Sequence, residues 1–279
     1  MTKPVQPIIT IFCAFSRPTM VEAWLQNLTQ VEHDPARTHL AIVLDMKMVK
    51  ALETIKKFAK QYNYASLEIL HNHDNEPMGG INGRRARIAF VKNQSKDIIK
   101  KHKSEYVIGL EDDTVFEFKC FCRLLEPFMS RENIGFVEGV QAGRWGCPYV
   151  GVWSVDDYEF VQRIESLTLP EQEPRDSIDD KGYEQIDGGG FYYYATPYDL
   201  YLEHDYSWSG EYWGADVNYG LWLRNKGYTC LVDWQSRCGH RTVEGQVIYP
   251  TESTVSVCYY KRDNKWERQD RTPSHDRAS

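Results

Sequence analysis

Three apolar runs in the first quarter of the chain alternate with segments that have helical periodicity. Residues 8–15, 40–44 and 67–70 are rich in β-branched, aromatic and other apolar side chains, which is typical of buried strands. The segments after the first two runs place apolar residues three and four positions apart, the spacing of one helical face. Because strands that alternate with such helices form parallel βαβ units, we expect an α/β protein with a mostly parallel sheet flanked by helices.

A further strand-like run ends in three consecutive carboxylates. Tyr106 to Leu110 are mainly apolar, and Glu111, Asp112 and Asp113 follow directly. Open parallel sheets bind ligands at the carboxyl ends of their strands, and Mg²⁺ or Mn²⁺ prefer oxygen ligands that they share with substrate phosphates. Glu111 and Asp113 are two positions apart, so in an extended chain their side chains point the same way. A solvated acidic turn is the alternative interpretation, because short acidic patterns recur by chance.

Composition limits the classes of function. The chain has 279 residues with 33 basic and 40 acidic side chains, a net charge of −7, which argues against a strongly electrostatic nucleic-acid binder but not against a local basic groove. It contains no apolar run of 18 residues, so we expect no transmembrane helix and no membrane partner. The absence of a secretory signal pattern and seven irregularly spaced cysteines favour a cytoplasmic location, in a bacterium or a phage-infected host.

A polar, glycine-rich segment over residues 71–83 precedes a helix that we expect to run from Arg84 to about Lys101. Arg84, Arg85 and Arg87 would then lie at its N-terminus, where positive charge is unfavourable. These arginines therefore predict a bound anion, with a solvated basic turn as the alternative.

The second half of the sequence is less regular. Residues 168–186 are acidic and contain prolines, and we expect a flexible insert there. A glycine turn at 187–190 precedes an aromatic strand, and a helix should begin near Asp216. From residue 261 onward the chain is charged and lacks an apolar period, which predicts a frayed tail over residues 261–279.

The order of these features resembles the GT-A class of nucleotide-sugar glycosyltransferases, most closely its large inverting family with a D-x-D motif. The resemblance covers about residues 8–242 and implies a Rossmann-like GT-A sheet with a mixed subregion on the acceptor side. It implies one domain over residues 1–260, with a nucleotide-binding half at 1–117 and an acceptor and catalytic half at 118–260. The features that carry it are the strand ends at Ser16-Arg-Pro18 and Asp45, the arginine-rich helix start, the acids at 111–113, Gly188-Gly-Gly-Phe191, Gly214-Ala-Asp216 and Lys226-Gly-Tyr228.

The resemblance implies a nucleotide-sugar donor, with a UDP-sugar the best match, and a Mn²⁺ or Mg²⁺ cofactor. The metal would be bound by Glu111, Asp113 and His240, although Glu111 stands where the family has Asp and His240 could instead be a buried structural histidine. The residues implied in donor binding are Phe15, Ser16, Arg17, Asp45, Arg84, Arg87, Asp112, Gly189 and Gly190.

The same resemblance implies that Asp216 is the catalytic base, because it matches the second residue of the family's Glu-Asp pair. The residue before it is Ala215 rather than an acid, so Glu211 is a rival candidate. A carboxylate here would accept the proton of the acceptor hydroxyl, while a metal ion would neutralise the leaving diphosphate. Asp216 could also be only a first-turn acid that stabilises its helix. The sequence leaves inversion or retention open.

The acceptor is open as well. Lys96, Lys100, Lys101 and Lys103, the basic tail from Lys261, and Trp145, Trp208 and Trp213 permit a phage-type enzyme that adds a hexose or pentose to a flipped hydroxymethylated DNA base. The alternative is a solvated lysine face and a small-molecule, glycan or protein acceptor.

Two other classes of function remain. A sugar nucleotidyltransferase would also have metal-binding acids, but it would need a longer glycine-rich loop after the first strand than Ser16-Arg-Pro18. A non-catalytic nucleotide-sugar-binding module would bind without turnover. The oligomeric state is not indicated by the sequence.

Overall fold

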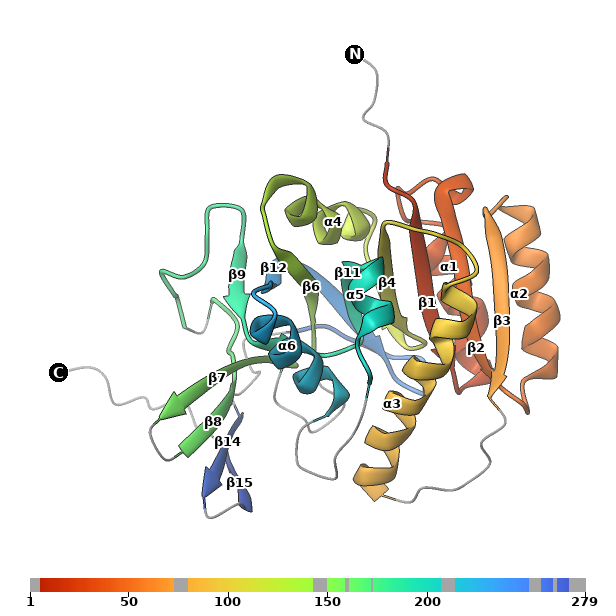
Figure 1. The fold of residues 1–279 in the computed structure, drawn as a ribbon. Helices are drawn as coiled ribbons and strands as arrows, with labels where there is room; N and C mark the ends of the chain where they lie inside the picture. The colour runs from red at the N-terminus through yellow and green to blue at the C-terminus, as the bar shows by residue number, and fades with distance from the viewer. Residues whose placement is uncertain are drawn as a thin grey trace.

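The structure is a computed structural model that describes residues 6–72, 80–142, 150–158, 161–171, 173–206, 214–250, 257–262 and 265–270. Within these ranges the chain forms a ten-stranded sheet with helices on both faces, and a five-stranded sheet that lies to one side of it (Figure 1). None of the described helices has the length and apolar character needed to cross a membrane.

The large sheet has the strand order β13-β12-β6-β11-β4-β1-β2-β3, with β5 and β9 paired to β12. Its strands are β1 (Ile9–Phe15), β2 (Thr38–Asp45), β3 (Ser66–Asn72), β4 (Tyr106–Glu111), β5 (Thr114–Val115), β6 (Ile134–Gln141), β9 (Tyr183–Ile186), β11 (Tyr193–Pro197), β12 (Thr229–Arg241) and β13 (Val247–Ile248). The helices are α1 (Val21–Leu28), α2 (Val49–Gln61), α3 (Gly80–Ile99), α4 (Cys120–Ser130), α5 (Tyr198–Glu203) and α6 (Ala215–Asn225). Two short 3-10 helices span Pro18–Met20 and Pro35–Arg37.

The expected parallel sheet is confirmed in the first half of the chain. β3, β2, β1 and β4 are parallel neighbours, and Cys13 on β1 pairs with Ile42 on β2 and Leu110 on β4. β11 then runs antiparallel between β4 and β6, and β6 pairs parallel with β12. The carboxyl ends of β1 and β4 therefore lie side by side, which places the acids after β4 beside the loop after β1.

Apolar side chains on the two faces of the sheet separate the helices into two layers. Odd-numbered β1 residues such as Ile11 pack with Trp24 of α1 and Ile55 of α2, on the same face as α4. Even-numbered Phe12 packs on the other face, which α3, α5 and α6 cover; this face is toward the viewer in Figure 1. A strand alternates its side chains between faces, so this parity decides which β1 residues can reach α3.

The five-stranded sheet consists of β10 (Gly188–Gly189), β7 (Val152–Tyr158), β8 (Val161–Ser166), β14 (Val257–Arg262) and β15 (Lys265–Asp270), in that order. β15 pairs antiparallel with β14, so residues 265–270 of the expected frayed tail form a strand. Backbone hydrogen bonds can hold a β-hairpin whose side chains show no apolar period. The sequence pattern therefore did not predict this strand.

The expectation of a flexible insert over residues 168–186 is wrong. Residues 183–186 form β9 on the edge of β12, and the Arg175 guanidinium forms a 2.9 Å ion pair with the buried carboxylate of Glu184. The indole N–H of Trp234 on β12 donates a 2.7 Å hydrogen bond to the same carboxylate. The acidic and proline-bearing composition hid these long-range partners, which fix the segment to the large sheet.

Two helix boundaries test local sequence signals. α3 begins at Gly80, four residues before the expected start, so Arg84 lies inside the helix and not at its first residue. Gly227 follows the end of α6, with a φ of +83° that glycine adopts without strain. Its N–H donates to the Arg224 carbonyl at 2.9 Å, and the Tyr228 N–H donates to the Leu223 carbonyl at 3.0 Å, as in a Schellman motif.

Candidate active site

A pocket of about 360 Å³ opens where β1 and β4 end, and α3 forms another of its walls. Its size is within the range of small-ligand sites, roughly 300–1,000 Å³. Five of the sequence-predicted residues line it: Ser16, Arg17, Arg87, Glu111 and Asp112. The other lining residues are Phe12, Ala14, Ile88, Val91, Lys92, Leu110 and Phe191.

Phe15 does not line this pocket, although it was predicted to bind the donor. Its side chain is buried on the α1 face, where it meets the Trp24 ring edge to face at 5.2 Å between ring centres. The even-numbered residues Phe12, Ala14 and Ser16 line the pocket instead. The β1 strand directs alternate side chains to opposite faces, so the neighbour of a pocket residue is a core residue.

Asp112 holds the loop after β1. One of its carboxylate oxygens accepts hydrogen bonds from the backbone N–H groups of Ser16 at 3.0 Å and Arg17 at 3.2 Å, and the Arg17 guanidinium contacts both oxygens. Charge-assisted bonds of this kind are about twice as strong as neutral ones. Asp112 therefore fixes the pocket rim through its own loop contacts.

Asp113 and His240 lie next to each other although 127 residues separate them in the chain. His240 Nε2 lies 3.0 Å from Asp113 Oδ2, and the Arg17 guanidinium lies 2.7 Å from the same oxygen. Burial alone would raise the pKa of Asp113, but the His240 hydrogen bond and the Arg17 charge together lower it below its ordinary value. The carboxylate is thus held in its ionised form.

The donor atoms of this pair suit a divalent cation. The Ala142 carbonyl oxygen lies 3.3 Å from His240 Nδ1, and a proton on Nδ1 would leave the Nε2 lone pair free to coordinate. A carboxylate and an imidazole together fit Mn²⁺. Within the described ranges no third histidine, cysteine, aspartate or glutamate joins the pair in a metal-binding group, and Glu111 lines the pocket instead. Substrate phosphates commonly complete such a site.

Asp216 lies in the first turn of α6. Its Oδ1 accepts a 3.0 Å hydrogen bond from the Val217 N–H, and burial raises its pKa, while the positive charges of Arg85 and Lys92 oppose that shift. Helix stabilisation and proton acceptance both use a carboxylate at this position, so its role as a base stays a prediction. Glu211, Trp145, Trp208 and Trp213 lie outside the described residues, as does the side chain of Arg84.

Asp45 and Arg87 also come together, near the pocket mouth. Asp45 ends β2 and Arg87 lies on α3, with 3.4 Å between a carboxylate oxygen and a guanidinium nitrogen. Both side chains remain partly exposed, so the pair contributes little to stability. The Asp45 pair holds the Arg87 side chain at the wall of the pocket.

Glu138 on β6 is a buried acid that sequence reasoning missed. It is fully buried, and neither carboxylate oxygen has a hydrogen-bond partner among the described residues. Burial raises its pKa well above the ordinary value, the negative charge of Asp216 adds to the shift, and the Gly190 N–H opposes it more weakly. A methyl group at Gly189 would overlap the Glu138 carboxylate, and one at Gly190 would overlap the Tyr192 ring. These glycines make room for neighbouring side chains.

Lys92 on α3 is the second residue that sequence reasoning missed. It is 3% exposed, yet its side chain lines the pocket. Burial lowers the pKa of the ammonium to about 7, and the negative charges of Glu111 and Asp216 oppose this shift. The available signal was its spacing from Ile88 and Ile99, which puts a lysine on the apolar stripe of the helix.

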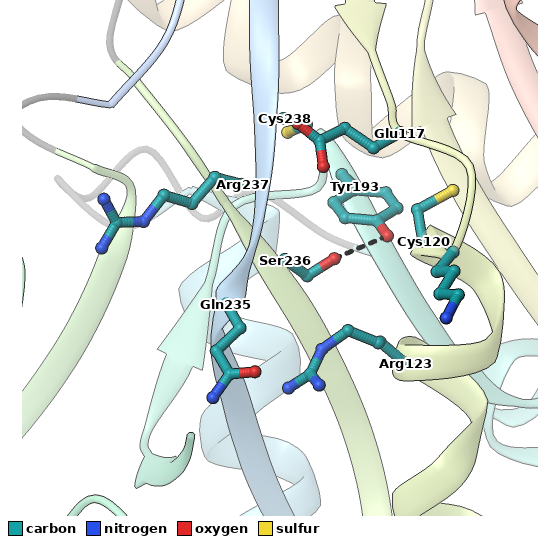
Figure 2. Close-up of a pocket in the computed structure, with 9 residues that line it drawn as sticks. Glu117, Cys120, Arg123, Tyr193, Gln235, Ser236, Arg237 and Cys238 are labelled. Atoms are coloured by element: carbon teal, nitrogen blue, oxygen red, sulfur yellow. Dashed lines mark hydrogen bonds between the residues drawn. The ribbon is translucent and has the colours of Figure 1, made fainter. Parts of the chain in front are cut away.

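A second, smaller hollow lies between α4 and β12, and none of the residues that line it also lines the larger pocket (Figure 2). Its volume is about 40 Å³, enough for about one water molecule. Tyr193 and Ser236 meet across it with 2.9 Å between their hydroxyl oxygens, and the buried thiol of Cys238 lies on its wall. It is too small for a substrate.

Comparison with known proteins gives matches at the level of structure. No protein-family model and no curated protein sequence matches the chain. The mannosyltransferase PcManGT from Pyrobaculum calidifontis, solved with GDP-Man and Mn²⁺, matches with a TM-score of 0.50 and 10% identity, over 81% of this chain and 55% of its own. GalNAc-T7, solved with UDP, GalNAc and Mn²⁺, matches with a TM-score of 0.56 and 14% identity, over 85% of this chain and 44% of its own.

The present chain thus spans about half the length of either match. At such identities the likeness concerns the fold alone. The chain has the GT-A fold of nucleotide-sugar glycosyltransferases.

Proposed function

We propose that this protein is a divalent-metal-dependent glycosyltransferase that moves a sugar from a nucleotide-sugar donor to an acceptor hydroxyl. The observation that carries the proposal is the Asp113–His240 pair, joined through Arg17 to a ligand-sized pocket at the strand ends of a GT-A fold. Structures of two proteins with this fold contain Mn²⁺ together with GDP-Man or with UDP and GalNAc, which supports the same donor class here.

Asp113 and His240 would hold Mn²⁺ or Mg²⁺, and Glu111 would face the donor from the pocket wall. When bound, the cation would neutralise charge that develops on the leaving diphosphate. Arg17 contacts Asp112 as well as Asp113, so it keeps one carboxylate partner when Asp113 turns to a cation. This arrangement protects the ionised form of Asp113 in the absence of ligand.

Asp216 would act as the base. The acceptor oxygen forms a bond to the anomeric carbon, the bond from that carbon to the diphosphate breaks, and the hydroxyl proton moves to the Asp216 carboxylate. Burial raises the pKa of Asp216, which makes the carboxylate a better proton acceptor than a solvated aspartate. Glu211 remains the rival for this role.

The lysine cluster does not support a DNA acceptor. Lys101 pairs with Glu68 at 2.7 Å and Lys100 pairs with Asp97 at 2.6 Å. Lys100, Lys101 and Lys103 follow the C-terminal end of α3, near Ser104, whose hydroxyl meets that of Thr10 at the start of β1. These three lysines therefore lie toward the amino end of β1, whereas the pocket opens at its carboxyl end.

The decisive experiment is incubation with Mn²⁺ and a panel of nucleotide-sugars, with and without candidate acceptors that include hydroxymethylated DNA. We expect release of a nucleoside diphosphate and a hexose or pentose mass on one acceptor. Release of pyrophosphate in the presence of a sugar phosphate and a nucleoside triphosphate would indicate a nucleotidyltransferase. Binding without any turnover would indicate a binding module and would overturn the proposal.

A further inference from the structure

Lys92 places an ammonium group in the wall of the pocket, inside a shell of aromatic rings. Its Nζ donates a 2.6 Å hydrogen bond to Tyr194 Oη and lies 3.8 Å from the centre of the Phe191 ring. The rings of Tyr194, Phe12, Tyr206 and Tyr201 follow at 4.6, 5.3, 5.6 and 5.7 Å. Ring faces attract a cation, so this shell holds the ammonium in place without a carboxylate.

The shell leaves part of the bonding capacity of Lys92 unused. An ammonium has three N–H donors, and among the described residues Tyr194 is its one hydrogen-bond partner. No carboxylate in the described ranges lies within ion-pair distance of it, and the charges of Glu111 and Asp216 act on it from farther away. Burying a charge without an ion pair costs several kcal/mol, which a purely structural side chain such as Met or Leu would avoid.

The position of Lys92 indicates what its remaining donors bind. It lines the pocket from α3, whereas Asp112 and Arg17 line it from the strand ends. A lysine is a compact point charge that suits phosphate oxygens. The negative charges of Glu111 and Asp216 nearby would repel a carboxylate ligand. A diphosphate bound together with a cation would be repelled less, because the cation screens its charge.

Resting on the proposed function, we propose that Lys92 binds a phosphate oxygen of the donor's diphosphate. When the bond between the anomeric carbon and that diphosphate breaks, the electron pair stays on the phosphate oxygen. Lys92 retains its proton and stabilises the added charge by a shorter hydrogen bond. Lys92 would thus hold the leaving group from α3, while Asp113 and His240 would act on it only through a bound cation.

The test compares Lys92→Met with Lys96→Met as a matched control. Met fills an aromatic shell well, and Lys96 lies one turn further along α3, where its ammonium contacts the His204 carbonyl. Affinities are measured by calorimetry in EDTA, so that no metal contributes, for UDP, GDP, CDP and ADP and for their nucleosides. We expect Lys92→Met to lower the affinity for the diphosphate that the wild type binds by roughly 10- to 100-fold. The affinity for the corresponding nucleoside should fall by less than about 2-fold.

The control should match the wild type for both ligands. Equal weakening of nucleoside and diphosphate by Lys92→Met, or no change in either, would overturn the inference while leaving the proposed function intact. If the wild type binds none of the four diphosphates, even with Mn²⁺ added, the proposed function fails first. Lys92→Met could instead lose affinity for a uronic-acid nucleotide-sugar but not for the matching hexose donor or the free diphosphate. That result would assign Lys92 to a sugar carboxylate and contradict the proposal.

A measurement on the wild type covers the case in which Lys92→Met does not fold. Cyanate carbamylates neutral amines and is small enough to enter the pocket, and mass spectrometry locates the modified lysines. The diphosphate should slow modification of Lys92 several-fold while its nucleoside does not, and Lys96 should be unaffected by either. Equal protection by both ligands, or none by the diphosphate, would contradict the inference.

Discussion

Two groups of carboxylates lie near the pocket, and the protein holds them in opposite ways. After β4, Asp113 has a guanidinium at 2.7 Å and an imidazole at 3.0 Å, and these lower its pKa. Between β6 and α6, Glu138 has no hydrogen-bond partner among the described residues, and Asp216 has the Val217 N–H; both pKa values are raised by burial. The surroundings of the first group favour the ionised carboxylate, whereas burial of the second group disfavours it.

This difference separates two chemical tasks within one site. A carboxylate that stays ionised near neutral pH, beside an imidazole, suits a cation and its bound phosphates. A buried carboxylate with a raised pKa suits proton transfer, because its affinity for a proton is closer to that of the group it must deprotonate. Variants that remove one kind of carboxylate at a time should therefore separate the two tasks.

The largest effect is expected from Asp216→Asn. The amide preserves the shape and the contact with the Val217 N–H but cannot accept a proton, so turnover should fall by about 10²–10⁴-fold while donor affinity stays unchanged. Steady-state kinetics and calorimetry on the same preparation separate the two. If Glu211→Gln is the inactive variant and Asp216→Asn is near wild type, the base has been assigned to the wrong residue.

Asp113→Asn should lower turnover by on the order of 10²–10³-fold and should also weaken Mn²⁺ binding. The amide keeps a neutral oxygen near His240 but removes the charge that a cation needs. Mn²⁺ titration followed by electron paramagnetic resonance measures this directly, with Glu117→Gln as a control outside the pair. Full activity of the wild type in excess chelator would rule out the metal role.

Gly189→Ala should destabilise the fold by roughly 1–3 kcal/mol, because the new methyl group would overlap the Glu138 carboxylate. Urea unfolding measures the loss. Combining it with Glu138→Ala removes the overlapping group, so the two effects should be clearly non-additive. Simple addition would show that Glu138 and Gly189 do not meet as described.

The smallest effect concerns Glu138→Gln and pH. A raised folded-state pKa means that the contribution of Glu138 is fully present below the ordinary Glu pKa, about 4.3, and is lost as pH rises through the folded-state value. Gln cannot ionise, so the variant does not lose this contribution. The free energy of unfolding of Glu138→Gln should therefore increase relative to that of the wild type as pH rises from 5. Parallel stability profiles from pH 5 to 9 would show that Glu138 is not held in its protonated form.

The sequence predicted the regular half of the fold well and the long-range contacts poorly. The apolar runs of the sequence coincide with β1, β2, β3 and β4, and their composition alone indicated strands. β9 was missed because its register depends on β12, more than forty residues later, and its own residues are half polar. Strand propensity reports on packing against neighbours, which a local pattern does not contain.

The candidate site shows the same division. The acids after β4 were predictable from their place at a strand end, whereas the approach of His240 came only from the resemblance and its ligand role stays a prediction. Glu138 was overlooked because it is a single charged residue in an otherwise apolar strand, and Lys92 because it is one of several charged residues in α3. Such residues are costly to bury, so a lone charge on an apolar stripe is itself a signal that sequence analysis can use.

The backbone ladder that joins β5 to β12 has a consequence for the order in which the molecule assembles. Gly239 pairs with Val115, and the Arg241 N–H donates to the Asp113 carbonyl at 2.8 Å, so the chain closes a loop of more than 120 residues at this point. Contacts between residues so far apart in the sequence form late in folding, because closing the loop costs chain entropy before the contact can stabilise the fold. During synthesis the acids emerge long before the imidazole, and a nascent chain halted before β12 would present them without their partner.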